Sequence, residues 1–150
     1  MRLILFSCSL VIIGCVAIPK TTDDFKTGNY NSRFFCSDDS PEETHVFLTN
    51  KISECYAREN VMLVPFGNWA GAISTGTYIE TVVGEEGASQ IAMKFKTGHE
   101  QGYQQLIEIF PGDSCTTTVK VYELSSGWKK HSERIHNWLD GQEVSGCGLW

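Results

Sequence analysis

Residues 40–56 read SPEETHVFLTNKISECY, and they carry the strongest local signal in this sequence. Ser40 suits a helix N-cap, Pro41 suits the first helical position, and Glu43 completes a capping box. Apolar side chains then recur on one helical face, at Leu48, Ile52, Cys55 and Tyr56. The pattern predicts a helix over about residues 41–57, with Cys55 on its buried face.

On both sides of this helix, the pattern of apolar residues is typical of β-strands. Ile91, Met93 and Phe95 alternate with less apolar residues, which is typical of a half-buried strand. Strand-like or short apolar runs occupy residues 32–36, 61–65, 72–83, 91–95, 104–110 and 116–124. This order predicts an α+β fold, with one N-terminal helix packed on a curved antiparallel β-sheet whose other face is free for a ligand. Residues 128–138 fit either a long hairpin arm or a helix.

Length and charge limit the classes of protein. The chain has 150 residues, which suits one domain. Its 41% hydrophobic and 20% charged residues are typical of a globular protein. The 12 Lys and Arg residues against 18 Asp and Glu give a net charge of −6. This charge argues against a nucleic-acid binder that relies on bulk positive charge, but it allows a local basic patch.

The first 17 residues have the pattern of a secretory signal peptide. Arg2 gives a positive start, residues 3–16 are almost continuously apolar, and Cys15 and Ala17 suit a cleavage site. An uncleaved anchor and a lipoprotein signal remain as alternatives. The expected organisation is a signal peptide at 1–17, a flexible polar arm at 18–31 and one domain at 32–150, and we expect the protein to be secreted.

Cysteine usage fits an oxidising compartment. Four cysteines remain after the signal peptide: Cys36, Cys55, Cys115 and Cys147. An even number in a short secreted chain predicts two disulfides, and four cysteines allow three different pairings. The cysteines lack the paired spacing of a zinc site. We therefore predict neither a metal nor a cofactor.

Three polar residues are candidates for a chemical site. If Ile107 and Ile109 face the helix, Glu108 faces the opposite side of the sheet, and the same argument places Lys120 there. His136 lies between Ile135 and Asn137 and could face the same side. A carboxylate, a cation and an imidazole on one face could move a proton near a phosphate. The alternative is an ordinary solvated sheet face.

One stretch is both basic and aromatic. Its candidate binding residues are Trp128, Lys129, Lys130, Arg134, His136 and Trp138. Such a mixture can hold a phosphate backbone and stack bases, and it predicts a surface for RNA or a partner. The alternative is an exposed hairpin with its tryptophans turned inward.

The order of these pieces resembles the small secreted guanyl-specific fungal ribonucleases and the ribonuclease-like effectors of powdery mildews. Phe34-Phe35-Cys36 resembles the family's aromatic-x-Cys, followed by the helix over 40–57. Residues 106–110 resemble the strand with the catalytic glutamate, here Glu108, and His136 resembles the second catalytic histidine. The resemblance implies a ribonuclease-like fold with Cys36 bonded to Cys147 and Cys55 to Cys115.

The sequence departs from the family at its active site. The family's catalytic tyrosine and first histidine fall on Val64 and Phe66, and its arginine falls on Lys120, which cannot contact a phosphate in bidentate fashion. Glu108, Lys120 and His136 are then vestigial candidates.

The leading hypothesis is therefore a secreted, non-catalytic, monomeric effector that binds a host protein or RNA to promote infection. It has no membrane partner, and translocation into a host cell stays open. The alternatives are an active ribonuclease that uses Glu108 and His136, and an unrelated secreted ligand-binding or toxin-like module.

Overall fold

The structure is a computed structural model. It describes residues 17–66, 69–84, 87–144 and 146–147, with the backbone alone for residues 62–66 and 69–71. The expected signal peptide lies outside the described residues except for Ala17, so it stays a prediction. The α-helices are α1 (Thr22–Thr27), α2 (Pro41–Tyr56) and α3 (Lys129–Leu139), and a 3-10 turn, η1, covers Ser126–Trp128. The strands are β1 (Asn31–Ser37), β2 (Arg58–Phe66), β3 (Trp69–Val83), β4 (Ser89–Thr97), β5 (Glu100–Pro111) and β6 (Thr117–Glu123).

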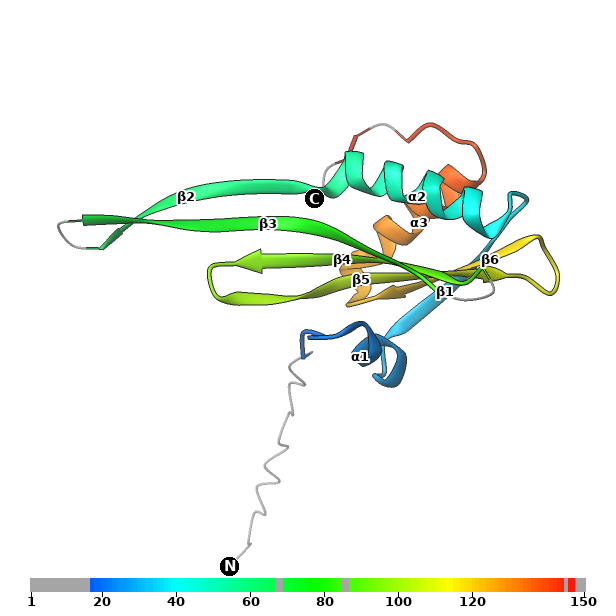
Figure 1. Cartoon of the computed structure of the whole chain (residues 1–150), viewed down its shortest axis with the longest axis horizontal. Helices are drawn as coiled ribbons and strands as arrows, with labels where there is room; N and C mark the ends of the chain where they lie inside the picture. Colours follow the sequence, from blue (N-terminus) through cyan, green and yellow to red (C-terminus); the bar gives the residue numbers. More distant parts are fainter. Residues whose placement is uncertain (1–16, 67–68, 85–86, 145, 148–150) are drawn as a thin grey trace, which may run out of the picture.

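The six strands form one antiparallel sheet in the order β1-β6-β5-β4-β3-β2. Helices α2 and α3 lie over one face, and α1 lies against the other (Figure 1). The predicted α+β class and antiparallel sheet are therefore confirmed. The expectation of a single helix is wrong, because the described residues form three α-helices on two faces.

Helix α2 begins as its sequence predicts. The Ser40 hydroxyl accepts from the Glu43 backbone N–H, and the Glu43 carboxylate accepts from the Ser40 backbone N–H. Leu48 and Ile52 are fully buried against the sheet, together with Cys55 and Tyr56 from the same helical face. Burial of each such aliphatic side chain contributes about 1.5–3 kcal/mol, so this contact is a main source of stability.

Residues 129–139 form a helix, which settles the ambiguity of the sequence. Helix α3 buries His131, Ser132, Ile135 and Trp138, whose spacing places them on one helical face. Ile135 and Trp138 join the core beneath α2. A strand would have exposed half of these side chains, so burial favours the helix.

The segment expected as a flexible arm contains α1. Thr21 caps this helix, and Asp24 completes a second capping box. Phe25 is only 1% exposed and packs with Ala92, Leu106 and Tyr122. The second sheet face is therefore partly covered, in contrast to the prediction of a free face. The segment was predicted as a flexible arm because its composition is polar, although the single residue Phe25 attaches it to the sheet.

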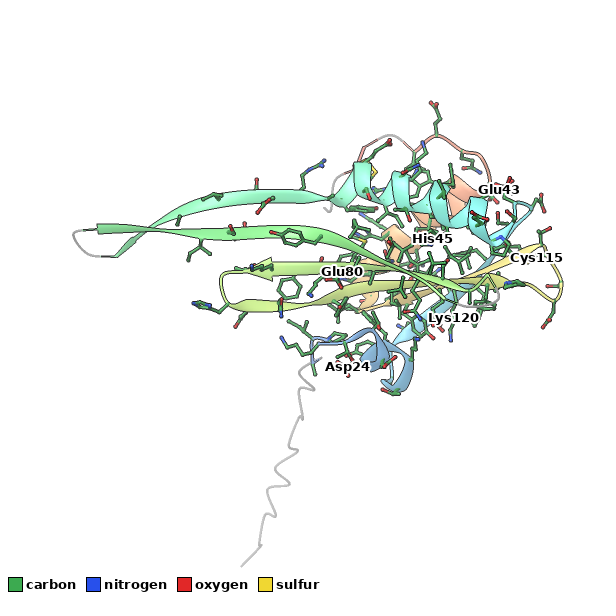
Figure 2. The ribbon with its side chains drawn as sticks, viewed as in Figure 1. Asp24, Glu43, His45, Glu80, Cys115 and Lys120 are labelled. Carbon is green, nitrogen blue, oxygen red and sulfur yellow. A yellow bond between two sulfur atoms is a disulfide. The ribbon has the colours of Figure 1, made fainter. Side chains whose placement is uncertain are left out.

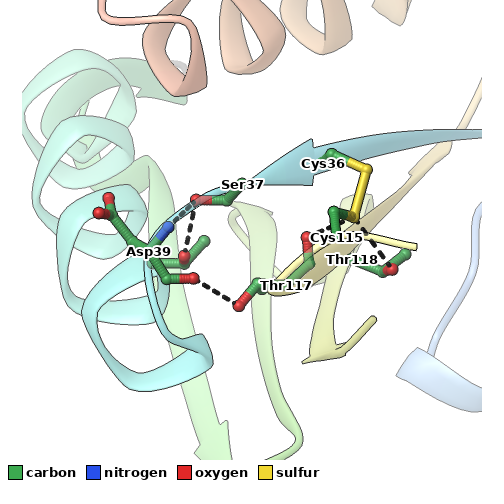
Figure 3. The surroundings of a disulfide bond; sticks show 7 residues. Cys36, Ser37, Asp39, Cys115, Thr117 and Thr118 are labelled. Atoms are coloured by element: carbon green, nitrogen blue, oxygen red, sulfur yellow. Dashed lines mark hydrogen bonds between the residues drawn. A yellow bond between two sulfur atoms is a disulfide. The ribbon is translucent and has the colours of Figure 1, made fainter. Parts of the chain in front are cut away.

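The two predicted disulfides are present, but their pairing differs from the one that the resemblance implies. Cys36 bonds to Cys115 and Cys55 bonds to Cys147, with Cα–Cα distances of 5.8 and 4.7 Å. Strand β1 pairs with β6, which places Cys36 opposite Thr118 and beside Cys115 (Figure 3). The strand order, which spacing along the sequence does not reveal, sets this pairing.

Candidate functional site

Glu108 and Lys120 are direct cross-strand neighbours on the face that carries α1. The register pairs Glu108 of β5 with Lys120 of β6. Ile107 and Ile109 are buried under α2, so the alternation of the strand turns Glu108 to the opposite face, as the sequence predicts. Figure 2 shows Lys120 on the α1 side of the sheet.

His136 lies on the other side of the sheet. Its ring packs edge-on against Phe35, with ring centroids 4.9 Å apart, and its Nδ1 lies 2.9 Å from a carboxylate oxygen of Asp140. Phe35 belongs to the core beneath α2, so the sheet separates His136 from Glu108. The expected set of three residues is therefore not assembled, because the segment is a helix over one face and not a strand.

The Glu108 carboxylate is already occupied by neighbours from three elements. The Tyr122 hydroxyl donates to one oxygen at 2.9 Å, and the Lys26 ammonium lies 3.2 Å from the other. Gln90 donates to the same oxygen as Lys26 at 3.4 Å. A carboxylate held by a hydroxyl and an ammonium is a structural anchor more than a poised base.

Lys120 lies over two aromatic rings. Its ammonium is 4.4 Å from the centre of the Tyr122 ring and 5.3 Å from that of Phe34. Cation–π contacts of this kind contribute roughly 0.5–1 kcal/mol at exposed sites. We call Lys26, Phe34, Glu108, Lys120 and Tyr122 the Glu108 face. A pocket of about 320 Å³ borders it and is lined in part by Gln90, Glu108 and Phe110.

Sequence reasoning missed three members of the Glu108 face. Tyr122 and Phe34 were detectable, because each lies on the same face as Lys120 by strand alternation or pairing. Lys26 carried no signal, because its segment resembles a polar arm. In the Glu108 face, Lys26 of α1 thus contacts a sheet carboxylate that also accepts a hydrogen bond from the sheet residue Tyr122.

The basic, aromatic stretch does not form the expected stacking platform. Trp138 is 5% exposed and belongs to the core. Trp128 packs against His131, with ring centroids 4.5 Å apart. Trp138 therefore offers no free ring face of the kind that single-stranded RNA needs, and half-buried Trp128 has its ring against His131.

The cations of this stretch are also partly engaged. Arg134 donates to the Tyr56 hydroxyl, and its guanidinium lies 5.6 Å from the centre of the Tyr56 ring. Burial raises the pKa of the Tyr56 hydroxyl, although the hydrogen bond from Arg134 acts in the opposite direction. Lys129 lies 3.7 Å from Glu133, and Lys130 is exposed. Lys129 and Lys130 are thus a small basic spot at the start of α3.

A scan against protein-family models finds no match, and searches of curated proteins and of solved structures find no significant one. Within the described part of the chain, no three His, Cys, Asp or Glu side chains are grouped as metal ligands would be. In the same part of the chain, no helix has the length and apolar character needed to cross a membrane.

Proposed function

We propose that this protein is a secreted, non-catalytic, ribonuclease-like effector that acts by binding a host protein. The observation that carries the non-catalytic part is the separation of Glu108 and His136 by the sheet. Cleavage of RNA by acid–base chemistry needs a base and an acid on opposite sides of one phosphate, each within hydrogen-bond reach. Two groups on opposite faces of a sheet cannot meet this requirement.

The remaining groups of the Glu108 face favour the same conclusion. Lys26 and Tyr122 already bind the carboxylate. Lys120 offers a point charge where a bidentate donor would stabilise a phosphorane better. The family positions that fall on Val64 and Phe66 bring no polar side chain.

Charge and burial favour a protein over RNA as the partner. Removal of residues 1–17 takes away one basic residue, Arg2, so the mature chain has 11 basic and 18 acidic side chains and a net charge of −7. Affinity for RNA rests largely on neutralising phosphates, and an acidic chain with one small basic spot opposes it. Secretion is supported by the two disulfides. The ribonuclease-like part rests on the order of α2 after β1 and before the other five strands of the antiparallel sheet.

The decisive experiment incubates the oxidised chain 18–150 with guanosine-containing RNA and measures turnover. We expect no cleavage above buffer, and the same result for Glu108→Gln and His136→Gln. Cleavage that disappears in Glu108→Gln would overturn the proposal in favour of an enzyme. RNA binding that weakens with salt and is lost in Lys129→Glu/Lys130→Glu would replace the protein partner with RNA.

A further inference from the structure

Strand β3 has an open edge along its second half. Strand β2 pairs with β3 only as far as Arg58 opposite Thr77, whereas β3 continues to Val83. Residues 78–83 pair with β4 on one side, and within the described chain no backbone hydrogen bond reaches their outer side. Side chains 80–83 are exposed. An open strand edge presents unpaired N–H and C=O groups to any extended chain that approaches it.

Helix α2 turns this open edge into a groove. Figure 1 shows α2 running along the second half of β3. A pocket of about 410 Å³ lies at one end, where Ser53 of α2 meets Thr77 and Tyr78. A second pocket of about 350 Å³ lies at the other end, where α2 meets Val83. Both pockets are lined by α2 and by β3 but share no lining residue, and they mark the two ends of the strip between α2 and the open edge, which we call the groove.

The dimensions of the groove fit one short strand. From Glu42 to Ser53, α2 advances 11 residues, or about 16 Å at 1.5 Å per residue. From Tyr78 to Val83, β3 advances five residues, or about 16 Å at 3.3 Å per residue. Helix and open edge therefore run side by side for the same length, which corresponds to a bound segment of about six residues.

The 350 Å³ pocket combines apolar walls with polar atoms that lack a partner. Val46 and Val83 line it and are 54% and 75% exposed. Ser89 and His45 also line it, and the Ser89 hydroxyl and the His45 Nδ1 are buried without a hydrogen-bond partner in the described chain. Ser89 is 6% exposed as a residue. Apolar walls with a few unpaired polar groups are typical of a binding pocket.

We infer that this groove binds an extended peptide segment of a partner protein, which adds to the open edge of β3 as a further strand. Every second residue of a strand directs its N–H and C=O groups to a given side, so residues 78–83 supply three such pairs. One apolar side chain of the segment enters the pocket between Val46 and Val83. Main-chain bonds then give affinity and the pocket gives specificity.

The charge of the groove defines the partner further. Among the residues that line the two pockets, Glu42 and Glu59 are acidic and Arg58 is basic, and the whole chain has a net charge of −6. The bound segment therefore carries Lys or Arg beside its apolar residues. A second copy of this chain would bring a second acidic α2 to the same edge, and repulsion between like charges disfavours it. The proposal deepens the proposed function, because it names the class of partner and rests on the protein acting by binding.

The test is a selection of displayed random heptapeptides on the oxidised chain 18–150, followed by affinity measurements on the selected peptides. We expect basic peptides with alternating apolar residues, and amide NMR shifts at residues 78–83 when they bind. Val46→Asp should weaken binding about tenfold or more, because it places a carboxylate on the apolar wall. Val61→Asp is the matched control, because Val61 is 66% exposed and lies on β2, outside the groove.

Three results would overturn the proposal: no peptide is selected, the selected peptides bind Val46→Asp as well as the parent, or the amide shifts lie elsewhere. Both valines are exposed, so a thermal melt can verify that each variant is folded. The RNA turnover assay involves neither valine. Failure of the groove and failure of the non-catalytic proposal are therefore distinguishable.

Discussion

The ammonium of Lys26 in α1 lies 3.2 Å from the carboxylate of Glu108 on β5. This contact joins the N-terminal segment to the polar part of the sheet, directly beside the apolar contact that Phe25 makes with the same face. Two hydrogen bonds also connect this segment to β5. The Tyr103 N–H donates to the Pro19 carbonyl, and the Lys20 ammonium donates to the Gln101 carbonyl. The segment is thus part of the folded unit.

We predict that Phe25→Ala lowers the free energy of unfolding by about 3–5 kcal/mol, because it empties a buried aromatic site. Lys26→Met should change it by less than about 1 kcal/mol, because a partly exposed ion pair contributes little. Urea denaturation of both variants measures the difference. Equal, small effects of the two substitutions would mean that α1 does not pack on the sheet.

Tryptic mapping without reduction should join peptide 34–51 to peptide 97–120, and peptide 52–58 to peptide 135–150. Each of these peptides contains one of the four cysteines, so the linked masses identify the pairing. A link between 34–51 and 135–150 would restore the pairing that the ribonuclease resemblance implies.

Cys55→Ser/Cys147→Ser should lower the free energy of unfolding by about 2–5 kcal/mol, since the disulfide restricts the unfolded chain.

Leu48→Ala should lower the free energy of unfolding by about 2–5 kcal/mol, because Leu48 is fully buried between α2 and the sheet. Val46→Ala is the control on the same helix, and its effect should stay within about 0.5 kcal/mol because that side chain is exposed. Thermal or urea melts of the pair suffice. A neutral Leu48→Ala would show that α2 does not bury this face.

Acidification should weaken the fold through His45. Burial lowers the pKa of the His45 imidazole below its usual 6.5, so the unfolded chain takes up the proton first as the pH falls. The contribution of His45 to stability is therefore intact above about pH 6.5 and declines between that value and its lowered pKa. Urea unfolding at several pH values should show a shallower pH dependence for His45→Gln than for the parent. Identical slopes would contradict the prediction.

Local signals predicted a large part of the fold. The capping box and apolar face of α2 could be predicted because all the residues involved lie within about five helical turns of one another. The alternation of strand side chains likewise predicted that Glu108 and Lys120 lie on the same face of the sheet. The short α1 buries a single apolar residue, Phe25. A helical period cannot be recognised from one residue, so α1 was not predicted.

The parts that could not be predicted depend on long-range contacts. The disulfide pairing follows from β1 lying beside β6, two strands separated by most of the chain. His136 was misplaced because its segment fits two periods, and only the core beneath α2 selects the helix. The open edge of β3 arises from where β2 stops pairing, which depends on the register between them and not on composition.

The two disulfides also set a problem for oxidative folding. Cys36–Cys115 spans 79 residues and Cys55–Cys147 spans 92, and each loop encloses one cysteine of the other. A chain that enters an oxidising compartment N-terminus first brings Cys36 and Cys55 together before either native partner has arrived. A bond between these two thiols forms the wrong pair, which only thiol–disulfide exchange can undo. If the chain is secreted as proposed, correct maturation therefore requires that Cys36 stay reduced until Cys115 has entered, or that thiol–disulfide exchange later replace the first bond.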